Sequence, residues 1–352
     1  MIDIILGLPH LGKGALLARA KALACPILIS ANALSRWDHQ QGSRIWSGWK
    51  YDQLRNAQGI TALCLDSAGY TAMAAYGGYP WSADAYVALA AAYPFKWWAA
   101  LDYCVEDGVA RDREEVLDRI ARTVRANHEC QRRAIDRGIA GTFLPVIQGR
   151  TPEDYRRCAD ALASLIERSP VIGVGSMCRR PVHGPEGLVA VLDQLDRTLP
   201  RSCRLHLFGV KGGAIPYLRA FGHRVASVDS QAYGVSARRH AHRSGVVKTD
   251  LMVAAHMERW LMAQQAKLRD PIRALPVAAT LMGAMIPVDA WGSAIAQARE
   301  QMRALIRSGD LDHDALTTVW VQEWAAALLQ EWQEHANLDG RPATRSADAL
   351  PC

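Results

Sequence analysis

The sequence predicts a (β/α)8 barrel followed by a helical C-terminal appendage, and three observations support this prediction. Short apolar runs typical of strands alternate with amphipathic segments typical of helices up to about residue 240. Such alternation implies parallel strands joined by right-handed crossovers. The alternation repeats eight times, which is the size of a barrel of this kind. After residue 240 only helical patterns continue. A doubly wound parallel sheet is the alternative fold, since one sequence does not settle topology.

The strands are expected where short apolar runs end in a polar residue or a glycine, at 2–6, 26–30, 60–66, 97–102, 142–147, 171–175, 204–209 and 225–229. Helices are expected between them at 112–137, 152–168, 184–198 and 213–221. The segment Thr151-Pro152-Glu153-Asp154 marks a helix start, because it offers a hydroxyl N-cap, a proline in the first turn and acids at the positive end of the helix dipole.

The change of pattern divides the chain into three regions. We expect a barrel domain over residues 1–240 and a helical region over 241–336, with helices at 246–267, 287–308 and 314–335. Residues 337–352 form a polar tail that we expect to be loose.

Composition narrows the class of protein. No apolar run reaches the length of a membrane span, and the N-terminus lacks the features of a signal peptide, so we expect a cytoplasmic protein with no membrane partner. The eight cysteines are scattered without a CxxC pair, which argues against a zinc knuckle or a disulfide scaffold. We expect no metal and no cofactor. The net charge is +6, and all but seven of the 41 basic residues are arginine, which suits phosphate contacts but also fits a bias of genome composition.

Two motifs resemble a phosphate-binding loop and a metal site, but each departs from the pattern that such a site requires. The stretch GLPHLGKG at 7–14 nearly matches a phosphate-binding loop, but Gly14 stands where a hydroxyl should hold magnesium, so a glycine-rich turn is expected. His240 and His242 have alternate spacing that metal ligands also show, but they follow the last strand in a basic run, where solvent or phosphate contacts are expected.

Polar residues and glycines recur at the carboxyl ends of the predicted strands: Asp66, Asp102, Gln148, Gly173, Gly175, Phe208, Gly209 and Asp229. Barrel enzymes keep their active site at this rim. Three carboxylates and one carboxamide suit covalent catalysis at a glycosidic carbon, in which one carboxylate attacks and another transfers protons. The third carboxylate can accept two donors, as guanine offers, and the carboxamide can donate to a carbonyl. Spacing alone does not identify a nucleobase as the substrate.

Five segments in order resemble motifs of the tRNA-guanine transglycosylase superfamily. They are LDSAGY, LDYC, VIQGR, LFGVKG and SVDSQAYGVSARR, and the resemblance covers roughly residues 60–240. Members are (β/α)8 enzymes that exchange guanine in a polynucleotide for a 7-deazaguanine.

The resemblance implies a role for each strand end. Asp229 would be the nucleophile that attacks C1′ and expels guanine, and Asp66 would be the general acid/base. The base would be bound by Ser67, Tyr70, Asp102, Gln148, Gly173, Val174, Gly175, Phe208 and Gly209. Of these, Asp102 and Gln148 would read the purine edge, the backbone N–H groups of 173–175 would meet a carbonyl or substituent, and Tyr70 and Phe208 would sandwich the ring.

Departures from the superfamily pattern point to its DNA-modifying branch, the DpdA-like deazapurine DNA transglycosylases. No cysteine lies between 203 and 352, so the zinc subdomain of the tRNA enzymes is missing, and helices are expected in its place. The V-G-E after the sixth strand reads Met177-Cys178-Arg179 here. Losing that acid favours a neutral incoming base, 7-cyano-7-deazaguanine (preQ0), over the aminomethyl base preQ1.

The contacts to nucleic acid are expected on the same rim. Arg238 and Arg239 would hold phosphate near the reaction. The stretch 35–55, expected as a loop, combines three tryptophans with Arg36, Arg44 and Lys50. These side chains suit stacking and backbone contacts with DNA, although the tryptophans equally suit packing the loop down. A target base in duplex DNA must leave the stack, so base flipping is expected.

Two other functions stay open on sequence alone. One is a divergent tRNA-guanine transglycosylase with the same chemistry on another polymer. The other is a non-catalytic nucleic-acid-binding barrel, a partner subunit in which the carboxylates are relics. The sequence does not show whether a helicase or ATPase partner opens the duplex.

Overall fold

The computed structural model describes residues 2–40, 43–106, 112–178, 180–269, 288–307, 321–322 and 324–329. The strands are β1 (Asp3–Leu8), β2 (Ile27–Ser30), β3 (Ser35–Gln40), β4 (Ser43–Trp49), β5 (Leu63–Asp66), β6 (Trp97–Ala99), β7 (Phe143–Leu144), β8 (Val146–Ile147), β9 (Val171–Val174), β10 (Arg204–Leu207) and β11 (Val225–Ser230). All except β3 and β4 form one sheet in the order β7-β6-β5-β2-β1-β11-β10-β9-β8, and every pair in it is parallel.

The sheet closes into a barrel through Pro145. The two ends of the sheet order, β7 and β8, are consecutive pieces of one segment that this proline separates, because proline has no N–H to donate to a ladder. On one side of the segment, Ala100 N–H donates to Leu144 O at 2.9 Å, and on the other, Gly173 N–H donates to Pro145 O at 2.7 Å. The predicted (β/α)8 barrel is confirmed, with each of its eight expected strands in place.

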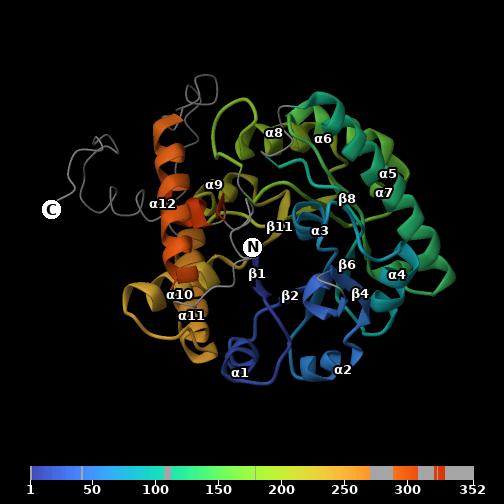
Figure 1. The fold of residues 1–352 in the computed structure, drawn as a ribbon. Coiled ribbons are helices and arrows are strands. Elements are labelled where there is room, and N and C mark those ends of the chain that lie inside the picture. Colours follow the sequence, from blue (N-terminus) through green and yellow to red (C-terminus); the bar gives the residue numbers. More distant parts are fainter. Residues whose placement is uncertain are drawn as a thin grey trace. The chain divides into compact units, whose positions relative to one another are not determined.

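The helices between the strands lie around the barrel (Figure 1). The described residues form the helices α1 (Ala15–Ala22), α2 (Tyr51–Leu54), α3 (Gly69–Tyr76), α4 (Ala83–Ala91), α5 (Arg113–Asp136), α6 (Pro152–Ala161), α7 (Ala163–Ile166), α8 (Leu188–Thr198), α9 (Ile215–Leu218), α10 (Ala232–Arg243), α11 (Asp250–Arg269) and α12 (Val288–Arg307). Short 3-10 turns are η1 (Ala31–Leu34), η2 (Arg55–Ala57), η3 (Ala140–Thr142) and η4 (Arg219–Phe221). None of the helices described is long and apolar enough to cross a membrane.

The expected start of α6 is confirmed in detail. The Thr151 hydroxyl accepts a hydrogen bond from Asp154 N–H at 3.2 Å, and Asp154 Oδ2 accepts one from Thr151 N–H at 3.0 Å, which completes a capping box. Arg113, at the first position of α5, donates to both oxygens of Asp154, so the starts of α5 and α6 are tied together.

Alternation along the strands separates two layers of the core. Outward-facing residues such as Leu6, Ile29 and Leu207 pack against the helices in the largest cluster of buried residues. The barrel interior holds a second cluster, composed of Ile5, Leu28, Cys64, Trp97, Ala99, Ala100, Leu144 and Val146, with Phe208 packed against it. In β5, Cys64 faces the barrel interior, and alternation places Asp66, two residues further, on the same face. The Asp66 carboxylate therefore lies at the carboxyl end of the barrel.

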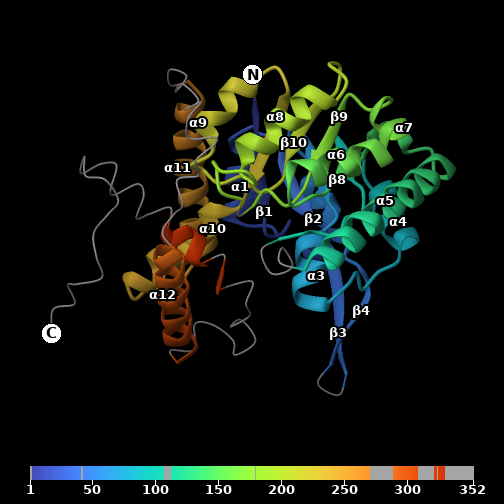
Figure 2. The same cartoon turned by 90° about the horizontal axis from the view of Figure 1, so that it is seen from above.

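The stretch 35–55 is not the loop that we expected. Strands β3 and β4 form an antiparallel hairpin that extends from the barrel after β2 (Figure 2). Its side chains alternate, since Trp37 and Trp46 are half-buried while Arg36, Asp38 and Ile45 are exposed. That alternation is a strand signal, which the three tryptophans obscured in the sequence.

Aromatic packing holds the base of the hairpin. Trp46 contacts Trp49 and Trp81 at ring-centroid distances of 5.0 and 6.2 Å, and Trp37 contacts Tyr76 at 4.7 Å. Trp49 is buried and its indole N–H donates to Ala85 O at 2.9 Å. The tryptophans therefore anchor the hairpin to the barrel, which is the second of the two roles considered for them.

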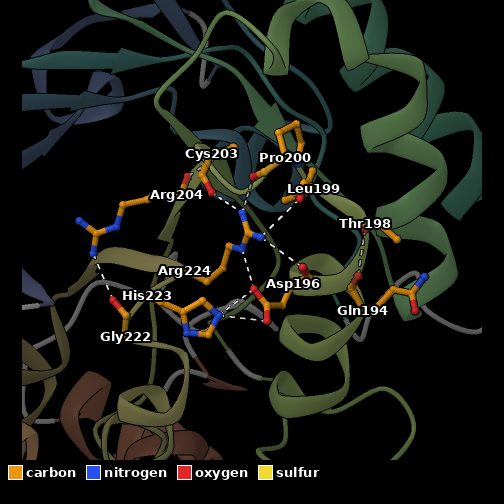
Figure 3. Close-up of polar contacts among 10 residues, drawn as sticks. All are labelled: Gln194, Asp196, Thr198, Leu199, Pro200, Cys203, Arg204, Gly222, His223 and Arg224. Atoms are coloured by element: carbon orange, nitrogen blue, oxygen red, sulfur yellow. Dashed lines mark hydrogen bonds and ion pairs between the residues drawn. The ribbon is translucent and has the colours of Figure 1, made fainter.

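The amino-terminal end of the barrel is held by Arg224, shown in Figure 3. This buried guanidinium lies just before β11 and donates to the Asp196 carboxylate at 2.9 Å and to backbone carbonyls at the end of α8 and before β10. His223, which is exposed, contacts the same carboxylate at 2.9 Å. One arginine thus ties the start of β11 to the α8–β10 connection.

The chain divides into two compact units. Among the described residues, the first unit runs to Arg238 and resumes from Lys248 to Arg269, so that α11 belongs with the barrel and packs against α1. The second comprises Arg239–Val247 and the residues described after 287. This division differs from the expected boundary at residue 240. The second unit has its own apolar core, in which Ala298 and Met302 of α12 and Trp324 are fully buried. The tail 337–352 lies outside the described residues.

Candidate active site

Asp66, the last residue of β5, has a strongly raised pKa. Burial and the charges of Asp102 and Asp229 raise the pKa of its carboxyl from 3.8 to about 7, although hydrogen bonds from Ala68 N–H and the Ser30 hydroxyl oppose the shift. Ser30 ends the neighbouring strand β2 and pairs with Asp66 in register. A carboxyl with this pKa is half protonated near neutrality and can both give and take a proton.

Asp102 lies three residues beyond the end of β6 and is almost fully buried. The Ser67 hydroxyl donates to its Oδ1 at 2.5 Å, and the Gln148 amide donates to its Oδ2. Tyr79 bonds its main chain, since its hydroxyl accepts from Asp102 N–H at 3.0 Å and lies 2.8 Å from Asp102 O. Burial raises the pKa of Asp102, and the hydrogen bonds from these side chains oppose that rise.

The orientation of the Gln148 amide follows from a directed chain of hydrogen bonds. Val105 N–H donates to the Ser176 oxygen at 2.9 Å, so the Ser176 hydroxyl is left to donate to Gln148 Oε1, at 2.7 Å. The amide nitrogen must then face Asp102. These hydrogen bonds place the Asp102 carboxylate next to an N–H of the Gln148 amide. Guanine complements this pair, since its N1–H and N2–H₂ can donate to the carboxylate and its O6 can accept from the amide.

Glycines make room for this pair of side chains. A Cβ on Gly175 would overlap the amide nitrogen of Gln148, and a Cβ on Gly69 would lie 2.5 Å from Asp102 Oδ1. A Cβ on Gly173 would lie 2.6 Å from the ring of Phe208. Glycine is therefore required at these positions because side chains of the site occupy the space beside them.

The peptide of Gly175 is fixed from behind by Arg180. Tyr155 OH donates to Gly175 O at 2.6 Å, and the buried guanidinium of Arg180 donates to the same hydroxyl oxygen at 3.0 Å. Arg180 also donates to Gly149 O and Arg150 O, so it joins the loops that follow β8 and β9. This contact set leaves the backbone at the end of β9 little freedom.

Asp229 stands on β11 at the same end of the barrel. Its Oδ1 accepts a hydrogen bond from Gly209 N–H at 2.9 Å and lies 3.4 Å from Nε2 of His206. Gly209 has a φ of +69°, a conformation that glycine adopts without strain, and this turn aims its N–H at the carboxylate. Within the part of the chain that the structure describes, the recorded contacts of the Asp229 carboxylate are made by Oδ1 and none by Oδ2.

The structure also places the other expected base contacts. Phe208 packs in the barrel interior, edge to face with Trp97 at 6.1 Å, and Tyr70 packs against the small cluster of Ala72, Met73 and Cys104. Whether Tyr70 and Phe208 sandwich a base stays a prediction. The same holds for the backbone at Val174, whose side chain is buried on the outer face of the sheet.

The segment that departs from the superfamily pattern lies next to the nucleophile candidate. Met177 is buried. Cys178 lies close to Gly209, since a Cβ added to Gly209 would lie 3.0 Å from the Cβ of Cys178. Arg179 falls outside the described residues. No group of three or more His, Cys, Asp or Glu side chains within the described ranges could hold a metal ion.

The basic residues expected to touch nucleic acid have different surroundings. Arg36 is exposed on the hairpin and contacts Asp52 at 3.2 Å. Lys50 follows β4 and is half-buried, whereas the side chain of Arg44 lies outside the described residues. Arg238 and Arg239 both lie on α10, and Arg239 is buried. Contact of any of them with DNA stays a prediction.

Several residues of this site were not identified from the sequence, among them Tyr79, Ser176 and His206. Tyr79 and Ser176 order the Asp102–Gln148 pair, and His206 lies beside Asp229. Ser176 directly follows the glycines at the end of β9, and His206 is a polar residue at an interior position of β10, so each carried a signal in the sequence. Tyr79 lies in a connecting segment and carried none.

The comparison with known protein families gives one match. The family described as DpdA, DeoxyPurine in DNA protein A, matches residues 35–306. That range includes every strand-end residue of the site from Asp66 to Asp229. No curated protein matches the chain.

Proposed function

The chain belongs to the DpdA family, and on this premise we propose that it is a transglycosylase that replaces guanine in DNA with a 7-deazaguanine through a covalent aspartyl-sugar intermediate. The observation that carries the proposal is the convergence of Asp66, Asp102 and Asp229 at one end of the barrel, close enough that the last two raise the pKa of the first. Each carboxyl has a different set of partners, which suits three different roles.

In the first half of the reaction, Asp229 Oδ2 attacks C1′ of the target deoxyguanosine and the bond from C1′ to N9 breaks. The electron pair of that bond leaves with guanine, which takes the proton of Asp66. Asp229 suits the attack because Gly209 N–H orients its carboxylate through Oδ1 and leaves Oδ2 open. Asp66 suits proton transfer because its pKa of about 7 keeps part of the population protonated at neutral pH.

In the second half, the incoming base loses its N9 proton to Asp66, and N9 attacks C1′ and displaces the Asp229 carboxylate. Both residues return to their starting states, so the exchange needs no cofactor or external energy. Asp102 and Gln148 would hold either base by the same edge, which guanine and 7-deazaguanine share. The groups that order this pair would keep its geometry ready before a base arrives.

For the incoming base we favour preQ0. The V-G-E of the tRNA enzymes reads Met177-Cys178-Arg179 here, so an arginine occupies the position of the acid and no carboxylate from that position would pair with a positively charged arm. Competition between preQ0 and preQ1 tests this choice, and a preference for preQ1 would contradict it.

For the polymer we propose duplex DNA with the target base flipped out of the stack. A carboxylate at the mouth of a barrel cannot reach C1′ of a stacked nucleotide. The β3–β4 hairpin and its Arg36, with Lys50 at its base, would contact the strand beside the flipped base, and Arg238 would contact phosphate. A helicase or ATPase partner that opens the duplex fits this proposal.

The test is base exchange by the purified full-length chain. Labelled guanine or preQ0 is offered with duplex DNA, single-stranded DNA or unmodified tRNA, and wild type is compared with Asp229→Asn. We expect label in DNA that depends on Asp229. Label only in tRNA would instead make the protein a divergent tRNA enzyme, and no label with tight DNA binding would favour a non-catalytic subunit.

A further inference from the structure

His206 is a buried polar side chain that has no role in the reaction steps proposed above. It lies on β10 inside the barrel and is fully buried. Its ring is confined by Trp97 and Phe208, at centroid distances of 4.8 and 4.5 Å, the latter edge to face. A histidine in such an apolar cage is costly unless both ring nitrogens find partners.

The two nitrogens of His206 face two residues of the neighbouring strand. Nδ1 lies 2.8 Å from the Ser227 hydroxyl oxygen, and Nε2 lies 3.4 Å from Oδ1 of Asp229. Nε2 has no hydrogen-bond partner among the described residues at normal distance. The carboxylate of Asp229 is thus the group towards which this nitrogen is directed.

A local irregularity in the sheet produces this arrangement. The β10–β11 register shifts between Leu205, which pairs with Val225, and His206, which pairs with Ser227. The shift leaves Ala226 as an extra residue and turns Ser227 and Asp229 to the interior face that His206 occupies. In an unshifted register the histidine would pair with Ala226 instead.

We infer that His206 is the positioning residue of the nucleophile: the Ser227 hydroxyl donates to Nδ1, which fixes the proton on Nε2, and Nε2–H holds Oδ1 of Asp229 together with Gly209 N–H. This inference rests on the proposed function. Two donors on one oxygen stop rotation of the carboxylate and leave Oδ2 facing the substrate. The hydroxyl sets the tautomer, as second partners of functional histidines commonly do.

A series of substitutions distinguishes the contribution of the His206 ring nitrogens from that of the packing of its ring. His206→Gln retains an N–H at about the reach of Nε2, and His206→Phe retains the ring in its cage without either nitrogen. Ser227→Ala removes the group that fixes the tautomer. His183→Phe is the control, because the half-buried His183 also packs edge to face on an aromatic ring, that of Tyr217.

Steady-state exchange kinetics with the full chain measure the effect on the nucleophile. We expect His206→Phe to lower kcat about 10–100-fold with little change in KM for the base, and His206→Gln to recover most of the loss. His183→Phe should match wild type. Full kcat in His206→Phe, or an equal rise in KM in all His206 variants, would overturn the inference.

Nitrogen-15 NMR of histidine-labelled protein tests the same geometry without activity. Wild type should show His206 as the neutral tautomer with the proton on Nε2, protected from exchange, with a shift that changes in Asp229→Asn and a mixture of tautomers in Ser227→Ala. A proton on Nδ1, or a signal insensitive to Asp229→Asn, would overturn the inference. If wild type exchanged no base, the proposed function would fail, while this spectrum would still decide the role of His206.

Discussion

Asp66 and Asp229 end strands that are separated by β2 and β1 in the barrel, yet the charge of Asp229 raises the pKa of Asp66. Asp102 acts in the same direction and is the larger of the two charge effects. The pKa of Asp66 therefore depends on both neighbouring carboxyls as well as on burial. In the proposed reaction, Asp66 holds the proton that the leaving base takes.

The pH dependence of guanine release follows from this relationship. The leaving base takes a proton from Asp66, so the single-turnover release rate should fall about tenfold per unit as pH rises above about 7. Asp102→Asn removes a charge that raises the pKa of Asp66, so the fall should begin at a lower pH. Release of labelled guanine from DNA across the pH range measures both. A fall that starts at the same or a higher pH in Asp102→Asn would contradict the assignment of Asp66.

The same raised pKa predicts how stability depends on pH. The folded protein binds the Asp66 proton more tightly than the unfolded chain, so the free energy of unfolding should decline as pH rises from about 4 to about 7. Asp66→Asn should remove this decline and stabilise the protein by about 2–4 kcal/mol above neutrality. Denaturant unfolding of wild type and variant at several pH values checks this. The prediction fails if both show the same slope.

Gly175 should be essential to base binding. A methyl group there would displace Gln148 from Asp102, so Gly175→Ala should raise KM for the base about 10–100-fold, as expected for losing hydrogen bonds in a buried site. Gly213→Ala is the control, because a Cβ at that position meets no atom within 4 Å. Exchange kinetics of the two variants make the comparison, and equal KM values would show that Gln148 does not hold the base.

Arg224 should matter for stability and not for chemistry. Arg224→Met leaves the Asp196 carboxylate with His223 alone and removes the donor of carbonyls at Pro200 and Cys203, so it should cost about 3 kcal/mol of unfolding free energy. His223→Ala removes only an exposed contact with the same carboxylate and should cost less than about 1 kcal/mol. Denaturant unfolding measures both values, and KM for the base should stay unchanged. Equal costs would mean that the Arg224 contacts in Figure 3 do not stabilise the fold more than the exposed His223 contact.

The sequence predicted the barrel and its strand ends because both depend on local pattern. Asp66 and Asp229 could be chosen because each ends a short apolar run, and in parallel strands those ends meet. The hairpin at β3 and β4 was missed because its three tryptophans suit a loop packed on its surroundings as well as they suit strands.

The order within the site could not be predicted, since it depends on contacts between distant segments. Ser176 is oriented by a hydrogen bond from Val105 N–H, which is 71 residues away in the chain, and Tyr79 accepts one from Asp102 N–H. His206 meets Asp229 only because the register shifts by one residue at Ala226. No pattern in a single sequence reports such a shift.

Covalent exchange at Asp229 is tested most directly by mixing DNA with stoichiometric protein and no incoming base and analysing the products. We expect release of at most one equivalent of guanine and a denaturation-resistant protein–DNA adduct, with the modified peptide containing Asp229. Asp229→Asn should give neither, and Asp66→Asn should form the adduct more slowly. Continuous release of guanine without an adduct, or an adduct that persists in Asp229→Asn, would contradict covalent exchange at Asp229.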